Sequence, residues 1–291
     1  MNGTEILMMR EYLVANSLQY DDEIHIKVAE RKEGKQFSFE EHIAALVYAQ
    51  LTNQTTWSRI VPNLDRIDEL FFYYDPYEIK KHPGSYFAEG IFSLKCGNRS
   101  TRAQMNYIHE NIATMEMIVN DYGSMDTFVL SNSPLQIVEL LAFTKSKYKM
   151  KMLGKALAWE YIRNVGIDAC KPDTHLRRFL GNERMGIASG MIATVDEVIS
   201  QVEQLSKETG LMLSSIDNVI WSYCAEGYGE ICTATPHCDR CVIQPNCKFN
   251  PCVSECVIDD KIPYEWLRKV SIDCDLDPTK IGKFILSKLE I

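Results

Sequence analysis

Four cysteines near the end of the chain have a spacing that suits a metal centre. Cys232, Cys238, Cys241 and Cys247 follow the pattern C-x5-C-x2-C-x5-C. Four thiolates serve as ligands both in structural zinc sites and in [4Fe–4S] clusters. Zinc sites usually have two close cysteine pairs, whereas this segment has one close pair with a single cysteine on either side. The spacing therefore favours a [4Fe–4S] cluster, with a zinc site and unliganded thiols as alternatives.

The composition is that of an ordinary intracellular globular protein. Apolar residues make up 46% of the chain and charged residues 24%, which is typical of soluble domains. No apolar run reaches the length of about 18 residues that a membrane span needs, and the N-terminus lacks the basic start and apolar block of a signal peptide. Disulfides are disfavoured inside cells. Cys252 and Cys256 are therefore expected to be buried small hydrophobes or competing ligands.

A lysine-rich segment stands out against the acidic background of the chain. The net charge of −9, taken alone, argues against a nucleic-acid-binding protein. Residues 144–155 (TKSKYKMKMLGK) nevertheless carry five lysines and no acidic residue. A local cationic face of this kind can bind phosphates even on an acidic protein, and a solvated lysine loop is the alternative.

The hydrophobic pattern predicts an all-α protein, because it has helical spacing throughout and no alternating strand runs. Ser38 and Glu41 form a capping box that opens a helix, and Gly166 supplies a left-handed stop. Helical stretches are predicted at residues 41–57, 86–94, 101–122, 134–143, 154–166, 192–205 and 214–224, with a further one after Asp173.

Four separated segments resemble, in order, the helix-hairpin-helix DNA glycosylases, and the nearest pattern is that of endonuclease III. IAALVYAQLTN (43–53) resembles the family helix that ends in Ala-Gln-x-Thr-Asp, with Asn53 in place of the acid. GNRSTRA (97–103) resembles a second family segment. LGKALAWEYIRNVGIDACKPDTHLRRFLG (153–181) resembles the second helix of the hairpin motif and the catalytic-aspartate segment. The fourth segment is the cysteine cluster, whose first gap is one residue shorter than in the family.

The resemblance implies a two-lobed, all-α fold with a [4Fe–4S] cluster loop. The six-helix barrel lobe is expected at residues 37–143, and the hairpin, aspartate segment and cluster loop at residues 144–250. Residues 1–36 would pack with the cluster lobe, and residues 251–291 form an extension of unknown role. Double-stranded DNA would lie in the groove between the lobes of a monomer.

The resemblance also implies two catalytic residues. Asp173 matches the family's catalytic aspartate, which stabilises positive charge on the sugar or activates the nucleophile. An aspartate before a helix is also a common N-cap, and the two roles are compatible. Lys155 lies eighteen residues before Asp173, as the Schiff-base lysine does in endonuclease III. Aligning Gly154 with the second hairpin glycine instead places Ala156 at the lysine position, and Lys155 then binds phosphate or is solvated.

The expected DNA contacts come from the hairpin turn at residues 151–154 and from the end of the helix that contains Gln50. Met152, Leu153 and Gly154 occupy the place of the hairpin that binds a phosphate through backbone N–H groups, although the family's Pro-Gly is missing. Lys151 would add sequence-independent affinity that weakens with salt. Gln50 matches the residue that fills the gap left by a flipped nucleotide, and a polar residue at a helix end is its alternative.

These features predict a DNA glycosylase of base excision repair that removes a damaged or mispaired base, either alone or with strand nicking as an AP lyase. A non-catalytic iron–sulfur protein that binds nucleic acid on the same scaffold is the alternative, and a zinc-stabilised structural module is a third hypothesis. No short motif in the sequence encodes the identity of the base.

Overall fold

The computed structural model describes residues 1–18, 23–53, 55 and 57–249. These residues form α-helices and short 3-10 turns, with no strand among them. The all-α prediction is therefore confirmed. Cys252, Cys256 and the extension at residues 251–291 lie outside the described residues.

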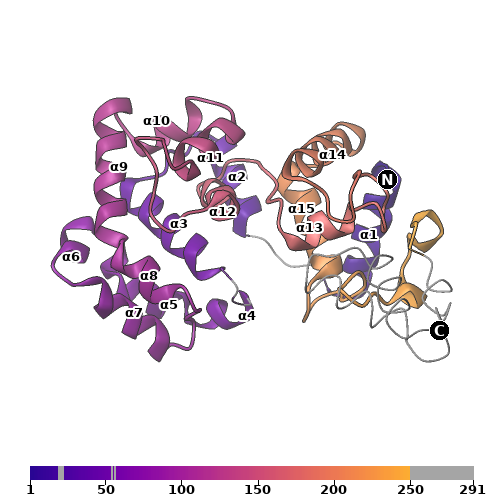
Figure 1. Ribbon diagram of the computed structural model, residues 1–291, viewed down its shortest axis with the longest axis horizontal. Coiled ribbons are helices and arrows are strands. Elements are labelled where there is room, and N and C mark those ends of the chain that lie inside the picture. Colours follow the sequence, from indigo (N-terminus) through magenta and orange to yellow (C-terminus); the bar gives the residue numbers. More distant parts are fainter. Residues whose placement is uncertain (19–22, 54, 56, 250–291) are drawn as a thin grey trace, which may run out of the picture.

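Two lobes lie side by side in Figure 1, each with its own hydrophobic core. The larger lobe holds α2 to α12, and the smaller lobe holds α1 and α13 to α15. The helices of the larger lobe are α2 (Glu23–Lys32), α3 (Phe39–Leu51), α4 (Trp57–Ile60), α5 (Leu64–Leu70), α6 (Pro76–Lys80), α7 (Gly84–Ser93), α8 (Thr101–Asn106), α9 (Ile108–Tyr122), α10 (Met125–Leu130), α11 (Pro134–Ala142) and α12 (Lys155–Asn164). Those of the smaller lobe are α1 (Gly3–Ala15), α13 (Thr174–Phe179), α14 (Val195–Thr209) and α15 (Leu213–Cys224).

The boundary between the lobes lies later in the chain than the expected position at residue 143. The core of the larger lobe continues through α12 to Ala169, and the core of the smaller lobe begins again at Cys170. The reason is that the apolar face of α12, which includes Tyr161 and Ile162, packs against α3 and α11. The second helix of the hairpin therefore belongs to the larger lobe, and residues 165–173 cross the junction.

The N-terminal segment divides between the two lobes. Ile6, Met9 and Leu13 of α1 lie in the core of the smaller lobe, packed on α14 and α15. Helix α2 packs instead against α12 and α15. Only the first helix of residues 1–36 thus packs wholly with the smaller lobe, because α2 contacts both lobes. Arg31 donates to Asp126 and to the carbonyl oxygen of Val165, and His25 lies 2.8 Å from Ser215 Oγ of α15.

Local capping signals determine several helix ends. Ser38 and Glu41 form the expected capping box at the start of α3. Gly166 has a φ of +74°, and a Cβ there would lie 2.5 Å from the carbonyl oxygen of Lys27. The stretch predicted as one helix at 101–122 is instead α8 and α9, because the chain turns at Tyr107. No helix in the described part of the chain is long and apolar enough to cross a membrane.

Candidate functional site

Asp173 lies where the chain has just crossed from the larger lobe to the smaller one. It is the N-cap of α13, and its Oδ1 accepts hydrogen bonds from the backbone N–H groups of His175 (2.8 Å) and Leu176 (3.1 Å). Its own N–H donates to the carbonyl oxygen of Lys171 at 2.7 Å, which closes a tight turn over Pro172. The carboxylate is partly exposed. The capping role is thus confirmed, and capping holds the group rigidly at the lobe junction.

The segment before Asp173 is attached to the first turns of α15 at two points. Asp168 accepts hydrogen bonds from the backbone N–H of Ser214 (3.0 Å) and from its hydroxyl (2.9 Å). Three residues later on both elements, the backbone N–H of Lys171 donates to Asp217 Oδ2 at 2.6 Å. The segment that carries Asp173 is therefore bound along one side of α15.

A buried cluster of charged side chains surrounds the second attachment point. Arg163 Nη1 of α12 lies 3.2 Å from both Asp217 Oδ2 and Glu160 Oε2, and Lys171 Nζ lies 3.5 Å from Glu160 Oε2. Burial raises the pKa of Asp217 to about 7, an effect that Arg163 opposes and the nearby Asp173 carboxylate strengthens. Burial would also raise the pKa of Glu160, but the charges of Lys171 and Arg163 outweigh it and hold that pKa below its usual value.

The sequence patterns that indicate the site do not include these four residues. The signal that could have found one of them is the single charged residue of an apolar helical stretch, as Asp217 is in LSSIDNVIWSYC. A charged side chain on a buried helix face needs a partner, and here the partner lies on another lobe.

The turn between α11 and α12 has a stable shape without the family's Pro-Gly. Asn111 of α9 binds the backbone of Lys151 on both sides, accepting from its N–H at 2.6 Å and donating to its carbonyl at 3.1 Å. Lys149 Nζ donates to the carbonyl oxygens of Met150 (2.5 Å) and Leu153 (2.6 Å). Met152 at the tip has a φ of +54°. An inward-facing lysine and a neighbouring asparagine thus hold the backbone that the sequence expects to bind phosphate.

The N-terminus of α12 is open to the surface. Its N-cap, Gly154, has no side-chain cap, and a Cβ built there would meet nothing within 4 Å. Leu153 is buried and anchors the turn, whereas Lys151 and Gly154 are exposed. The first N–H groups of a helix attract anions when nothing else binds them, so this arrangement is compatible with the expected phosphate contact.

Lys155 is the first residue of α12, and its side chain is 54% exposed. Its Nζ lies 3.6 Å from Glu139 Oε1 of α11. Within the described part of the chain no ion pair joins Lys155 to Asp173. The two expected catalytic residues are thus at opposite ends of the segment formed by α12 and the junction, and the structure does not bring their side chains into contact.

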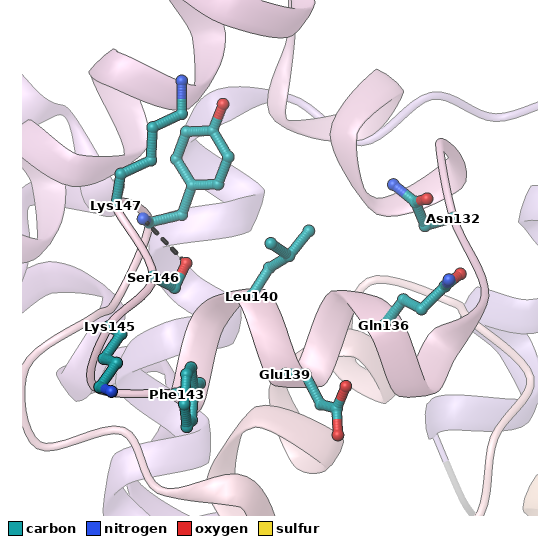
Figure 2. A pocket seen from close by; sticks show the side chains of 9 residues that line it. Asn132, Gln136, Glu139, Leu140, Phe143, Lys145, Ser146 and Lys147 are labelled. Carbon is teal, nitrogen blue, oxygen red and sulfur yellow. Dashed lines mark hydrogen bonds between the residues drawn. The ribbon is translucent and has the colours of Figure 1, made fainter.

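A cavity of about 640 Å³ lies beside the hairpin turn on the outer face of α11. Figure 2 shows Glu139, Phe143, Lys145 and Lys147 around it. Lys147 is engaged by Asp121 at 2.9 Å, and the ring of Phe143 is half exposed. Of the five lysines in residues 144–155, three have specific partners in the protein, so the cationic face is smaller than the sequence suggests.

Gln50 lies in the last turn of α3 with only 1% of its surface exposed. Its carbonyl oxygen accepts hydrogen bonds from Asn98 Nδ2 and Gln104 Nε2, both at 3.3 Å. Its own Nε2 has no hydrogen-bond partner among the described residues. In this conformation the side chain cannot fill a gap in a duplex, because it is packed inside the lobe. A DNA contact by Gln50 stays a prediction and requires the side chain to swing out.

The cysteine loop packs against α13 and α15, next to the helix that Asp173 caps. Arg184 Nη1 donates to Cys232 Sγ, Tyr223 Oη donates to Cys241 Sγ, and the N–H of Phe249 donates to Cys247 Sγ, each at 3.4 Å. A hydrogen bond from Cys224, with the charges of Arg184 and Arg178, lowers the pKa of Cys232 to about 6, whereas burial raises that of Cys238 to about 11.

Four thiols, three of which accept a hydrogen bond from an N–H or O–H group, have the chemistry of an iron–sulfur ligand set. Among the described residues, however, no group of three or more His, Cys, Asp or Glu side chains is arranged to hold a single metal ion. The donor types therefore fit the expected cluster, and the cluster itself stays a prediction.

The described residues thus form two helical lobes, with a turn between α11 and α12 and a capping aspartate after it. No family model matches the chain. Over 94 residues, or 29% of this chain, it is 35% identical to the 8-oxoguanine DNA glycosylase/AP lyase of Aquifex aeolicus, and the match spans only 39% of that relative.

A solved structure supports the same fold. The crystal structure of the Methanocaldococcus jannaschii 8-oxoguanine glycosylase/lyase, in complex with a 15mer DNA containing 8-oxoguanine, superimposes with a TM-score of 0.51 at 22% identity. The similarity covers 75% of this chain and 95% of that one. Together the two similarities confirm the resemblance to DNA glycosylases that the four sequence segments indicate.

Proposed function

We propose that this protein is a DNA glycosylase of base excision repair, with 8-oxoguanine as its first candidate substrate. The observation that carries the proposal is the position of Asp173, whose carboxylate is held rigidly and partly exposed at the junction of the two lobes. The similar proteins from Aquifex aeolicus and Methanocaldococcus jannaschii are both named as enzymes acting on this base. The proposed partner is double-stranded DNA, and the proposed reaction is cleavage of the bond between a base and its sugar.

The chemistry follows from what a glycosidic bond requires. Breaking the bond between C1′ and the base develops positive charge on the sugar, which a fixed carboxylate stabilises without having to reorganise. Asp173 is fixed by two backbone N–H groups of its own helix, so it is set before the substrate arrives. The open N-terminus of α12 at Gly154 and the exposed Lys151 bind the phosphate backbone on one side of the site.

The lyase step is assigned to Lys155. A lysine amine can attack C1′ and form a Schiff base, which leads to strand cleavage. Lys155 is exposed, and among the described residues it pairs with the carboxylate of Glu139, which lies at 3.6 Å in a solvated position. A pair of that kind is weak, so the amine is free to move toward a bound sugar.

The expected cofactor is a [4Fe–4S] cluster held by Cys232, Cys238, Cys241 and Cys247. When bound, such a cluster would cross-link the loop that supports α13. Arg178 Nη2, from that helix, donates to the carbonyl oxygen of Cys232 at 3.3 Å, and the loop thereby steadies the helix whose N-cap is Asp173. Purified protein is expected to absorb near 400 nm and to contain about four irons per chain. Zinc in place of iron would contradict this part of the proposal.

The test of the function is a panel of duplexes, each with one oxidised, deaminated, alkylated or mismatched base, assayed under single-turnover conditions with and without alkali. We expect cleavage of the 8-oxoguanine duplex and covalent trapping by borohydride, with no reaction on the undamaged duplex. Binding of every duplex without excision of any base would favour the non-catalytic nucleic-acid-binding alternative.

A further inference from the structure

Lys171 is held by three different interactions, two residues before Asp173. Its N–H donates to Asp217 Oδ2 at 2.6 Å, its Nζ lies 3.5 Å from Glu160 Oε2, and its carbonyl oxygen accepts the N–H of Asp173 at 2.7 Å. Pro172 lies between and restricts the backbone further. The place of the Asp173 backbone therefore depends on the place of Lys171.

Asp217 is the centre of this arrangement and is itself held from the other lobe. It is 2% exposed on α15 of the smaller lobe, and Arg163 reaches it from α12 of the larger lobe at 3.2 Å. Arg163 also lies 3.2 Å from Glu160 Oε2, so one guanidinium bridges two buried carboxylates. The ion pair thus joins the two lobes directly beneath the turn that carries Asp173.

Stability alone does not explain a buried charge cluster at this point. Removing charges from water is costly, and apolar side chains of similar volume often pack there with equal or greater stability. The segment is also already attached to α15 through Asp168 and Ser214. The charged cluster adds a second attachment of the segment to α15, close to Asp173. In this attachment Asp217 accepts the backbone N–H of Lys171 and fixes its orientation.

We propose that Asp217, oriented by Arg163, is a positioning residue for Asp173, acting through the backbone of Lys171. The inference rests on the proposed function, in which Asp173 is the carboxylate that faces the sugar. Asp217 touches neither DNA nor the reacting atoms. Asp217 determines where the Asp173 carboxylate lies relative to the groove between the two lobes.

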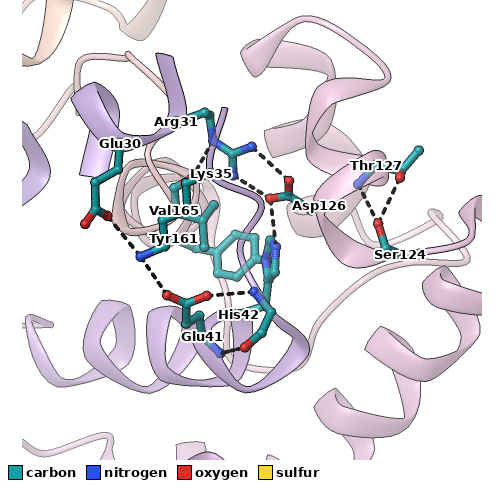
Figure 3. A network of polar contacts seen from close by, with 11 residues as sticks. Glu30, Arg31, Lys35, Glu41, His42, Ser124, Asp126, Thr127, Tyr161 and Val165 are labelled. Carbon is teal, nitrogen blue, oxygen red and sulfur yellow. Dashed lines mark hydrogen bonds and ion pairs between the residues drawn. The ribbon is translucent and has the colours of Figure 1, made fainter. Parts of the chain in front are cut away.

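A second buried pair serves as the matched control. Arg31 binds Asp126 with two hydrogen bonds, of 2.5 and 3.1 Å, and His42 lies 3.5 Å from the same carboxylate (Figure 3). This pair joins α2 to α10, and Arg31 also donates to the carbonyl oxygen of Val165 at 2.6 Å. Among the described residues, no hydrogen bond or ion pair joins Arg31 or Asp126 to residues 171–173. Asp126→Ala therefore breaks a buried Arg–Asp pair of the same kind without touching Lys171.

The experiment measures single-turnover excision, thermal stability and hydrogen exchange of the peptide that contains Lys171. Asp217→Ala is expected to slow excision about a hundredfold, as a displacement of about 1 Å does, and to expose the Lys171 amide to exchange. Asp217→Asn keeps an oxygen acceptor and is expected to stay within about fivefold of the wild type, the worth of one hydrogen bond. Asp126→Ala is expected to lower the melting temperature but to change excision by less than about threefold, because additivity holds for distant sites.

A double variant separates positioning from stability. Arg163→Met with Asp217→Leu replaces the ion pair between the lobes by apolar groups and is expected to be more stable than Asp217→Ala. Glu160 keeps its pair with Lys171 Nζ, but the backbone N–H of Lys171 loses its acceptor. Slow excision and fast amide exchange in this stable variant support the proposal. Excision that recovers together with stability, or an amide as protected in Asp217→Ala as in the wild type, would overturn it. If the wild-type protein excises no base, the proposed function fails, and hydrogen exchange still decides whether Asp217 sets the Asp173 turn.

Discussion

The ammonium group of Lys149 lies 2.6 Å from the carbonyl oxygen of Leu153 and 2.5 Å from that of Met150. Burial and the nearby charge of Lys151 lower the pKa of this lysine, as expected for a side chain that points into its own turn. Lys149 therefore stabilises the hairpin from inside, whereas Lys151 of the same segment is exposed. Two lysines that look equivalent in the sequence have different roles.

This difference predicts two distinct salt dependences of DNA binding. Lys149→Met is expected to weaken binding about tenfold by loosening the turn, the effect of losing about 1.4 kcal/mol, with an unchanged slope of log K against log salt. Lys151→Ala is expected to reduce the slope by about one, because one phosphate contact releases about one counterion. Binding titrations at several salt concentrations measure both the affinity and the slope of log K against log salt. A reduced slope in Lys149→Met would mean that Lys149 contacts phosphate.

Asp173→Asn is expected to abolish base excision while DNA binding persists. Asparagine is as good an N-cap as aspartate, so α13 and the melting temperature change little, but the carboxylate charge is lost. Single-turnover assays on the lesion duplex, together with binding measurements, test this. Unchanged turnover would remove Asp173 from the reaction.

Lys155→Ala is expected to abolish borohydride trapping on abasic DNA, since the Schiff base needs a primary amine. Lys145→Ala, which changes another exposed lysine of the same segment, is the matched control and retains trapping. Glu139→Gln removes only the exposed carboxylate partner of Lys155 and is expected to change the trapping rate by about fivefold or less, the worth of a surface ion pair. Trapping that survives in Lys155→Ala would favour the alignment that places Ala156 at the lysine position, with another amine as nucleophile.

The buried Asp126 predicts acid sensitivity of the larger lobe. Burial would raise the pKa of Asp126, but the adjacent His42 and the hydrogen-bonded, charged Arg31 outweigh it and hold that pKa well below the ordinary value of 3.8. As the pH falls, the carboxyl group of Asp126 is therefore protonated at a higher pH in the unfolded chain than in the folded protein. The stabilisation is present above about pH 3.8 and is lost as the pH falls below it toward the folded-state pKa.

Urea unfolding at a series of pH values tests this linkage. Asp126→Asn is expected to be less stable than the wild type at neutral pH and to lose less further stability below about pH 4, because the linked proton is gone. Glu116→Gln, which breaks the exposed pair with Lys80, is the control and should leave both stability and its pH dependence nearly unchanged. Parallel pH curves for Asp126→Asn and the wild type would contradict the prediction.

Short-range features of this protein are determined by the sequence. The capping box of Ser38 and Glu41 and the cap formed by Asp173 each join residues at most three positions apart. Their hydrogen bonds form wherever the helix forms, so a local pattern is enough to predict them. The all-α class follows in the same way from helical periodicity along the whole chain.

Long-range relationships were decided only by the tertiary structure. The hydrogen bond from Lys171 to Asp217 spans 46 residues, and that from Arg31 to Asp126 spans 95. The backbone carbonyl of Gln50 accepts hydrogen bonds from Asn98 and Gln104, which lie 48 and 54 residues later in the chain. Burial and the pairing of buried charges depend on which helix faces meet. That depends on the packing of both lobes together, which no segment of the sequence encodes by itself.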